Sequence, residues 1–218
     1  MKTPFLRIAP EGLSLLCSIA AAGWLFSFLG LGVLSFLCMA AFGFSVYFFR
    51  DPDREFSPEP GAVFAPSDGR VIAVSTESED TFLGREVTRV SVFLSIFDCH
   101  VNWFPVSGTV LSSERRAGRF HLGFSPKAGD ENERVATVIH PDGAPDILMF
   151  QVAGFVARRI ISYAGKGMSL EAGERFGIIK FGSRIDLFFP PQYKVEVRRG
   201  DVLTGRRTVV ARLSGEGQ

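Results

Sequence analysis

Cysteine and histidine are both scarce in this chain of 218 residues, which contains three of each. A small, odd number of cysteines argues against a disulfide framework and suits a reducing compartment. No pair of histidines has the spacing of a zinc site, so we expect no metal. The formal charge of +1, from 24 basic and 23 acidic residues, disfavours a nucleic-acid-binding protein. The glycine-rich motifs that bind nucleotide phosphates are also missing from the sequence.

Charged residues, histidine and proline are completely absent from Gly12 to Phe49. As one helix this run would be about 57 Å long, nearly twice the roughly 30 Å of a bilayer core. Two short helices that turn near Gly30 and Gly32 therefore fit better than a single span. A cleaved signal peptide is the alternative, but its apolar region is usually only about 7–15 residues long. Basic residues flank the run on both sides, at Lys2, Arg7, Arg50 and Arg54.

The sequence divides into three parts. Residues 1–49 are expected to form a transmembrane helical hairpin, and its basic flanks favour a cytoplasmic location for both ends. Residues 50–61 are charged and contain three prolines, which is typical of a linker. Residues 62–218 hold many short runs of β-branched and aromatic residues between glycine-rich turns. We therefore predict an α+β fold, in which a β-rich domain with barrel-sandwich-like sheets follows the hairpin.

The stretch IIKFGSRIDLFFP, residues 178–190, has the pattern of an apolar strand interrupted at Gly182 and Ser183. A β-bulge is the simplest explanation, because glycine inside a strand often marks one. The chemical alternative starts from backbone strain, which glycine permits and which proteins store at functional sites. The Ser183 hydroxyl could attack the Gly182 carbonyl in an N-to-O acyl shift. Elimination and hydrolysis would then cut the chain and leave an amino-terminal pyruvoyl group, provided that a base and oxyanion donors are present.

Two further residues have both a structural and a chemical interpretation. His100 lies in the apolar stretch SIFDCHVNWFPVSG, where a buried structural histidine and a catalytic histidine both fit the pattern. Asp68 lies in a Ser-Asp-Gly turn, where aspartate is favoured because it forms hydrogen bonds with the nearby backbone. Neither residue is specific when it is considered alone.

Several segments, in order along the chain, resemble the phosphatidylserine decarboxylase proenzymes of the short, membrane-anchored branch. They are FFRDPDR, APSDGRV, FDCHVNWFPVSG, ENER, QVAGFVARRI and GERFGIIKFGSRIDLFFP. A Gly-Ser dipeptide has little specificity by itself. The ordered set is specific, and it covers roughly residues 48–197.

The resemblance implies that the chain cuts itself between Gly182 and Ser183, into a β chain of residues 1–182 and an α chain of residues 183–218. Ser183 would become the pyruvoyl cofactor, and no metal would be required. The family's processing aspartate corresponds to Asp68. The histidine of its D-x-H stretch corresponds to His100, the candidate general acid. The implied reaction converts phosphatidylserine to phosphatidylethanolamine and CO2 through a Schiff base between the substrate amine and the pyruvoyl carbonyl.

One position departs from the longer members of this family. Those members have an H-x-x-H motif here, with separate work for the two histidines, whereas this chain has Trp103 at the second histidine position. Either His100 serves both steps, or His121 or His140 substitutes for the missing histidine. We favour the first alternative, because the short branch commonly shows a single histidine here.

Two other functions fit parts of the sequence. APSDGRVIAV and KVEVRRGDVLTGRRTVVARL look like pieces of a lipoyl-type barrel-sandwich domain, as in a non-enzymatic, membrane-anchored adaptor. That alternative leaves the Gly-Ser dipeptide unexplained, and a metallopeptidase would need a set of metal-binding histidines. For the decarboxylase we expect a place at the cell membrane with the catalytic domain on the cytoplasmic face. Phosphatidylserine and membrane lipid are the expected partners, and a homodimer is left open.

Overall fold

The computed structural model describes residues 7–118, 121, 131–154, 159–180 and 182–214. Two compact units make up the chain, Met1–Arg54 and Glu55–Gln218. The finer division into a hairpin, a linker and a domain, with boundaries at residues 49 and 61, stays a prediction.

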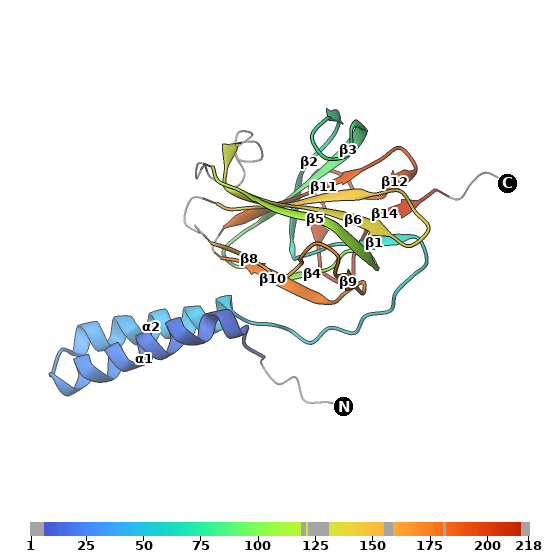
Figure 1. The fold of residues 1–218 in the computed structure, drawn as a ribbon. Helices are drawn as coiled ribbons and strands as arrows, with labels where there is room; N and C mark the ends of the chain where they lie inside the picture. The colour runs from blue at the N-terminus through green and yellow to red at the C-terminus, as the bar shows by residue number, and fades with distance from the viewer. Residues whose placement is uncertain (1–6, 119–120, 122–130, 155–158, 181, 215–218) are drawn as a thin grey trace. The chain divides into compact units, whose positions relative to one another are not determined.

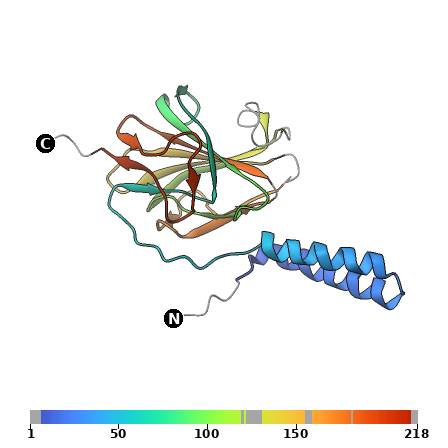
Figure 2. The same ribbon diagram turned by 180° about the vertical axis from the view of Figure 1, so that it is seen from behind.

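The first unit contains two apolar helices. A short 3-10 helix, η1 (Pro10–Gly12), leads into α1 (Leu13–Phe28), and α2 (Gly32–Phe48) follows after three residues. The helices lie side by side (Figures 1 and 2), and the Ser35 hydroxyl of α2 donates a hydrogen bond of 3.1 Å to the Gly23 carbonyl of α1. Ile8 forms a β-bridge with Arg50, so both ends of this unit lie together. The predicted pair of helices is therefore present.

Length separates the two helices as candidates for membrane spans. Among the described residues, only Pro10–Phe28 forms a helix long and apolar enough to cross a membrane, while Gly32–Phe48 is shorter. The transmembrane placement of the pair stays a prediction.

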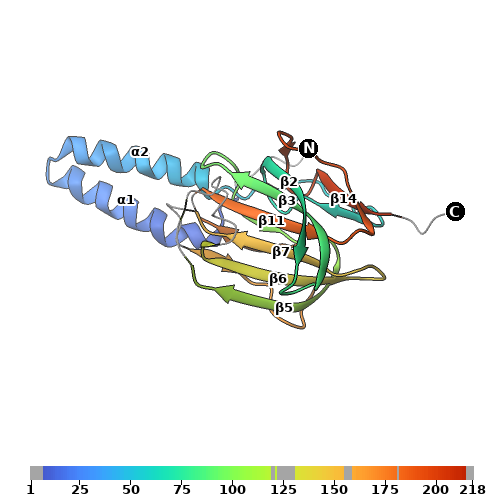
Figure 3. The same cartoon turned by 90° about the horizontal axis from the view of Figure 1, so that it is seen from above.

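The second unit is β-rich, as predicted. Its strands are β1 (Ala62–Phe64), β2 (Gly69–Glu79), β3 (Arg85–Leu94), β4 (Val101–Trp103), β5 (Gly108–Arg116), β6 (Arg134–Pro141), β7 (Ile147–Val152), β8 (Ile160–Ser162), β9 (Ser169–Leu170), β10 (Arg175–Ile179), β11 (Ser183–Phe189), β12 (Tyr193–Val195), β13 (Val202–Leu203) and β14 (Val209–Leu213). A curled eight-stranded sheet has the order β13-β2-β3-β11-β7-β6-β5-β9 (Figure 3). Two three-stranded sheets, β4-β10-β8 and β1-β14-β12, complete the unit. The barrel-sandwich detail stays a prediction.

The main hydrophobic core lies between the large sheet and the sheet β4-β10-β8, which Figure 1 shows below it. Alternate residues of β11 point into this core, and Ile185 and Leu187 are completely buried there. Phe176 and Ile179 of β10 reach the same core from the small sheet. Because side chains alternate along a strand, the residues between these on β11 face the opposite side of the large sheet.

A buried ion cluster lies on that opposite side of the large sheet. Asp186 is 0 % exposed, and its carboxylate accepts hydrogen bonds from Arg184 at 2.6 Å and from Arg89 of β3 at 2.7 Å. Arg184 also donates to the Ser91 hydroxyl at 2.8 Å, and Arg89 to Glu77 at 3.2 Å. The cluster links β2, β3 and β11 through charge-assisted hydrogen bonds.

Strand partners differ from those that neighbouring sequence suggests. The two strands on either side of the Ser-Asp-Gly turn exist, but β1 pairs with β14 and β2 pairs with β3. The bulge interpretation of residues 178–190 is wrong, because β10 and β11 belong to different sheets. Long-range pairing, which local sequence does not encode, decides both outcomes.

Among the described residues, Asp186 is the only carboxylate that contacts both arginines of the ion cluster. Its removal should therefore destabilise the folded protein. Replacing Asp186 with alanine leaves Arg89 and Arg184 buried without their main counter-charge, so we expect a loss of about 3–5 kcal/mol in the free energy of unfolding. The control is Glu114→Ala, which removes an exposed ion pair with Arg116 and should cost less than about 1 kcal/mol. Denaturant titration in detergent measures both values, and equal losses would contradict the prediction.

A second prediction concerns Tyr193, whose hydroxyl donates a hydrogen bond of 2.9 Å to the Pro145 carbonyl. Burial, together with the nearby Asp146 carboxylate, raises the pKa of Tyr193 from 10.0 to about 12. The folded state therefore holds this proton more tightly than the unfolded state. The resulting stabilisation is complete below pH 10 and is lost as the pH rises toward 12. The melting temperature of Tyr193→Phe should therefore fall less steeply with rising pH than that of the wild type across this window. Thermal unfolding measured at a series of pH values checks this.

Candidate active site

The Gly182–Ser183 peptide bond lies where the chain passes from one sheet to another. β10 ends at Ile179 in the three-stranded sheet, and β11 begins at Ser183 in the eight-stranded sheet. Gly182 has a φ of +59°, in the left-handed region that residues with a Cβ rarely adopt. Phe181 lies outside the described residues. The glycine thus meets a backbone requirement of this crossing.

Ser183 carries a hydroxyl that is buried and unsatisfied. The residue is 0 % exposed and pairs with Leu94 of β3. Its Oγ forms no hydrogen bond within the part of the chain that the structure describes. An unpaired buried hydroxyl costs about 1–3 kcal/mol, so its presence at this position calls for a functional explanation.

A second crossing between the same two sheets runs beside the first. β3 ends at Leu94, opposite Ser183, and β4 begins at Val101, opposite Ile178 of β10. Within residues 95–100, the backbone N–H of Ser95 donates to the Asp98 carboxylate at 2.7 Å. The two crossings therefore start and end on paired strands, at Leu94 opposite Ser183 and at Val101 opposite Ile178.

His100 lies at the end of this second crossing. Its backbone carbonyl accepts a hydrogen bond of 3.2 Å from the N–H of Ile179, three residues before Gly182. Its side chain is 0 % exposed, and Nδ1 lies 3.0 Å from the Asp98 carbonyl oxygen. A carbonyl only accepts hydrogen bonds, so Nδ1 carries the proton and Nε2 is the basic nitrogen of the neutral ring.

Asp68 lies in the turn that precedes β2. The residue is half-buried, and its Oδ1 accepts a hydrogen bond of 2.9 Å from the backbone N–H of Gly205. The N–H of Arg206 donates to the Ala65 carbonyl at 3.0 Å, which ties the same turn to the loop between β13 and β14. The carboxylate thus binds the backbone of a loop that lies 137 positions away in the sequence.

Strand register places Asp68 and Gly182 at the same end of the eight-stranded sheet. Both β2 and β11 pair antiparallel with β3, so they run in the same direction. Arg70 and Arg184 pair with Phe93 from its two sides, and Asp68 and Gly182 each lie two residues before these positions. β3 ends here and leads into the loop with the buried histidine. The Ser183 hydroxyl and the Asp68 carboxylate therefore come to one end of this sheet, and the loop that starts there carries His100. A hydroxyl, a carboxylate and an imidazole are groups that suit acyl transfer.

Comparison with known proteins identifies the family of the chain. A sequence model of the family described as phosphatidylserine decarboxylase matches residues 41–211. The chain belongs to the phosphatidylserine decarboxylase family. Among its relatives, the phosphatidylserine decarboxylase proenzyme of Nitrosomonas europaea is 40% identical over 216 residues, which cover 97% of this chain and 99% of the relative. The proenzyme of Nitratidesulfovibrio vulgaris is 36% identical over 217 residues and 100% of both chains, and that of Parabacteroides distasonis is 40% identical over 182 residues and 83% of both.

Trp103 stands where longer members of the decarboxylase family have a second histidine. Trp103 is 2 % exposed, and its backbone N–H donates to the Pro66 carbonyl at 2.8 Å. A Cβ built at Gly205 would come within 2.5 Å of the indole ring, so the ring packs closely on this glycine. The tryptophan braces the turn that carries Asp68, and it offers no group that titrates near neutral pH.

The remaining histidines differ in their distance from the sheet end. His140 lies near the end of β6 opposite to Arg134, and Arg134 pairs with Val152 at the end close to β11. His140 Nδ1 lies 2.6 Å from an Asp146 carboxylate oxygen at an exposed position. The structure therefore places His140 far from the Gly-Ser bond and argues against it as a substitute.

His121 lies closer, through a chain of hydrogen bonds. Its backbone exchanges hydrogen bonds with the Asn132 side chain, which also donates to the Ala153 carbonyl at 2.7 Å. Ala153 is one residue beyond Val152, which pairs with Arg184 of β11. His121 therefore stays open as a second histidine of the site, although its ring contacts Glu131 at 3.0 Å.

Two buried polar residues of this region were not singled out by the sequence patterns. Asn102 of β4 and Gln151 of β7 are 0 % exposed and share a hydrogen bond of 2.7 Å. Each interrupts an apolar strand, which is the one sequence signal that could have revealed them. Among the described residues, no group of three or more His, Cys, Asp or Glu side chains could hold a metal ion.

Proposed function

We propose that this chain cuts itself at the Gly182–Ser183 bond and then converts phosphatidylserine to phosphatidylethanolamine and CO2. The observation that carries this proposal is the buried Ser183 hydroxyl, which follows a left-handed glycine and has no hydrogen-bond partner among the described residues. The names of the relatives support the same substrate. Asp68 and His100, at the same sheet end, are the proposed partners of Ser183.

The proposed cut is an acyl shift followed by elimination. Ser183 Oγ attacks the Gly182 carbonyl carbon, and the peptide C–N bond breaks as an ester forms. Loss of the Cα proton of residue 183 then breaks the Cβ–Oγ bond of the same residue and releases Gly182 as a carboxylate. Water replaces the amino group of the resulting dehydroalanine, and ammonia leaves. We assign Asp68 to this processing step, which produces chains of residues 1–182 and 183–218.

The surroundings of Ser183 fit a pyruvoyl group. Its neighbours on the inner face, Leu94 and Ile185, are apolar and completely buried. No described residue forms a hydrogen bond with the Ser183 hydroxyl. The pyruvoyl group would supply a carbonyl that reacts with the substrate amine and accepts the electron pair that stays on the substrate carbon when CO2 leaves. His100, protonated on Nε2, is proposed to deliver a proton to the substrate carbon that loses its carboxylate.

The proposed substrate is a membrane lipid, so we also propose that residues 1–49 are a membrane hairpin. Its apolar side chains are widely exposed, including Trp24 at 71%, Phe28 at 78% and Val33 at 75%. The bridge between Ile8 and Arg50 brings both ends of the hairpin to one side. Residues 50–61 would link it to a catalytic domain of residues 62–218 on the cytoplasmic face of the cell membrane.

Self-cleavage predicts two chains on a denaturing gel. Purified wild-type protein should lose the full-length band, and its smaller chain should lack a free amino terminus. Ser183→Ala removes the nucleophile and should stay full length and inactive. The matched control is Ser162→Ala, because Ser162 is a half-buried serine whose hydroxyl also has no hydrogen-bond partner among the described residues, and this variant should be cut normally. An intact wild-type chain would contradict the proposal and favour the adaptor.

The two partner residues are tested separately, because Asp68 is assigned to cleavage, whereas His100 is expected to act in both cleavage and decarboxylation. Asp68→Ala should slow or abolish cleavage, because the carboxylate is assigned to processing. His100→Ala should reduce decarboxylation by about 10²–10⁴-fold when rates are compared per cleaved chain, as expected for a lost general acid. His140→Ala, at the exposed far end of β6, is the control. Normal cleavage of the Asp68 variant, or an unchanged rate per cleaved chain without His100, would remove that residue from its role.

A further inference from the structure

A pair of buried amides joins the two sheets next to the proposed site. The Gln151 Nε2 of β7 donates to the Asn102 Oδ1 of β4 at 2.7 Å, and the Asn102 Nδ2 donates to the His100 carbonyl at 3.2 Å. All three residues are 0 % exposed. The chain of hydrogen bonds thus begins at the backbone of the loop beside Gly182 and ends at Gln151.

The direction of these hydrogen bonds is determined by the carbonyl at one end. The His100 carbonyl only accepts, so the Asn102 nitrogen must face it and the Asn102 oxygen must face Gln151. The Gln151 nitrogen must therefore face Asn102, and Gln151 Oε1 is left as an acceptor. This oxygen is buried and forms no hydrogen bond with any described residue. A buried acceptor with no donor indicates a missing partner.

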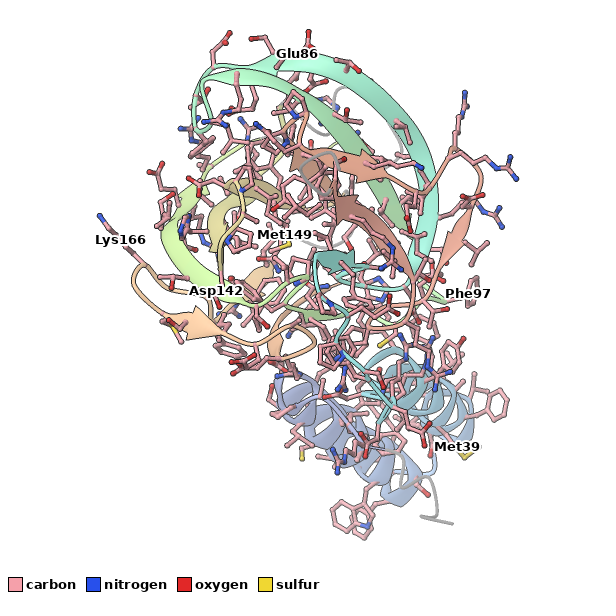
Figure 4. All side chains as sticks on the ribbon, turned by 90° about the vertical axis from the view of Figure 1, so that its right-hand side faces the viewer. Met39, Glu86, Phe97, Asp142, Met149 and Lys166 are labelled. Atoms are coloured by element: carbon pink, nitrogen blue, oxygen red, sulfur yellow. The ribbon has the colours of Figure 1, made fainter. Side chains whose placement is uncertain are left out.

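Gln151 faces the same interior as Ser183. Gln151 pairs with Ile185, and Ser183 lies two residues before Ile185 on the same face of β11. Figure 4 labels Met149, a buried core residue two positions before Gln151 on the same face of β7. Diagonal neighbours on adjacent strands have Cα atoms about 7–8 Å apart, within reach of a long side chain. The unsatisfied acceptor and the proposed electrophile therefore belong to one site.

We infer that Gln151 Oε1 accepts a hydrogen bond from the α-amine of the substrate and orients it toward residue 183. Gln151 would then be the residue that selects a lipid headgroup with a primary amine. This inference rests on the function proposed above. Once the amine is bound, its N–H provides the donor that Gln151 Oε1 lacks.

The chemistry of the attack explains why an amide suits this place. An amine attacks a carbonyl only in its neutral form. A carboxylate beside the amine would favour the ammonium form, whereas an uncharged interior favours the neutral amine. The inner-face neighbours of Gln151 on β11 and β7, Ile185 and Met149, are apolar and buried. An amide oxygen orients the N–H and stabilises the charged form less than a carboxylate would.

Two substitutions at Gln151 and one control test the inference. Gln151→Leu removes the acceptor, and Gln151→Glu replaces the amide with a carboxyl. Thr137→Val is the control, because Thr137 is 0 % exposed on β6, and its hydroxyl also has no hydrogen-bond partner among the described residues. Cleavage is read on a gel. The mass of the α chain is read after treatment with phosphatidylserine and cyanoborohydride, and separately after treatment with methoxyamine, which is neutral near pH 7.

All variants should be cut, and all should react with methoxyamine like the wild type. Phosphatidylserine labelling per α chain should fall about tenfold or more in Gln151→Leu, as expected for one lost hydrogen bond. In Gln151→Glu the labelling profile should move to higher pH, because the carboxyl favours the ammonium form. A purely structural role would not move this profile. If Gln151→Leu does not fold, the pH profile of Gln151→Glu decides.

Normal phosphatidylserine labelling of Gln151→Leu, or an unshifted profile for Gln151→Glu, would overturn the inference. Failure of cleavage in Gln151→Leu, with normal cleavage of Thr137→Val, would also overturn it, because Gln151 would then serve the Ser183 hydroxyl. Failure of the proposed function gives a different result. The wild type itself would stay uncut or would not react with methoxyamine.

Discussion

The pairing register of β11 is the constraint on which both the fold and the proposed site depend. In the observed register Ser183 faces the interior, while Arg184 and Asp186 face the opposite side of the sheet and meet Arg89. A slip of one residue would exchange the two faces. It would place two charged side chains in the apolar core, at a cost of several kcal/mol for each ion, and would turn Ser183 away from the site. The buried ion cluster therefore disfavours the one-residue slips that would turn the serine away from the site.

Two adjacent crossings between sheets give the site its composition. One crossing carries Gly182 and Ser183, and the other carries His100, while Asp68 precedes a strand that starts at the same sheet end. Because both crossings start and end on paired strands, neither can shift without breaking sheet hydrogen bonds. A rigid sheet end can hold the proposed scissile bond and the Ser183 hydroxyl in a fixed geometry better than a surface loop can. Trp103 adds to this rigidity by bracing the turn that carries Asp68.

The interior next to Ser183 is polar at a few points and apolar elsewhere. The Ser183 hydroxyl and the Gln151 carbonyl oxygen are both buried without hydrogen bonds among the described residues, and each costs stability. The surrounding core, with residues such as Leu94 and Ile185 completely buried, offsets these costs. The cost in stability thus falls on the groups for which we propose chemical roles, as is common in active sites.

The sequence by itself determined the class of the fold, the two apolar helices and the residues of the proposed site. Those features depend on local composition and on motif order: an uncharged run from Gly12 to Phe49, β-branched runs after residue 61, and a Gly-Ser dipeptide in a specific setting. Local sequence did not show that β10 and β11 lie in different sheets, that Asp68 meets Gly205, or that Gln151 joins Asn102. Those outcomes depend on contacts between residues about 50 to 140 positions apart, which form only when strands pair and pack. Tertiary structure alone therefore decided that the glycine marks a crossing between sheets, and which buried polar groups surround the serine.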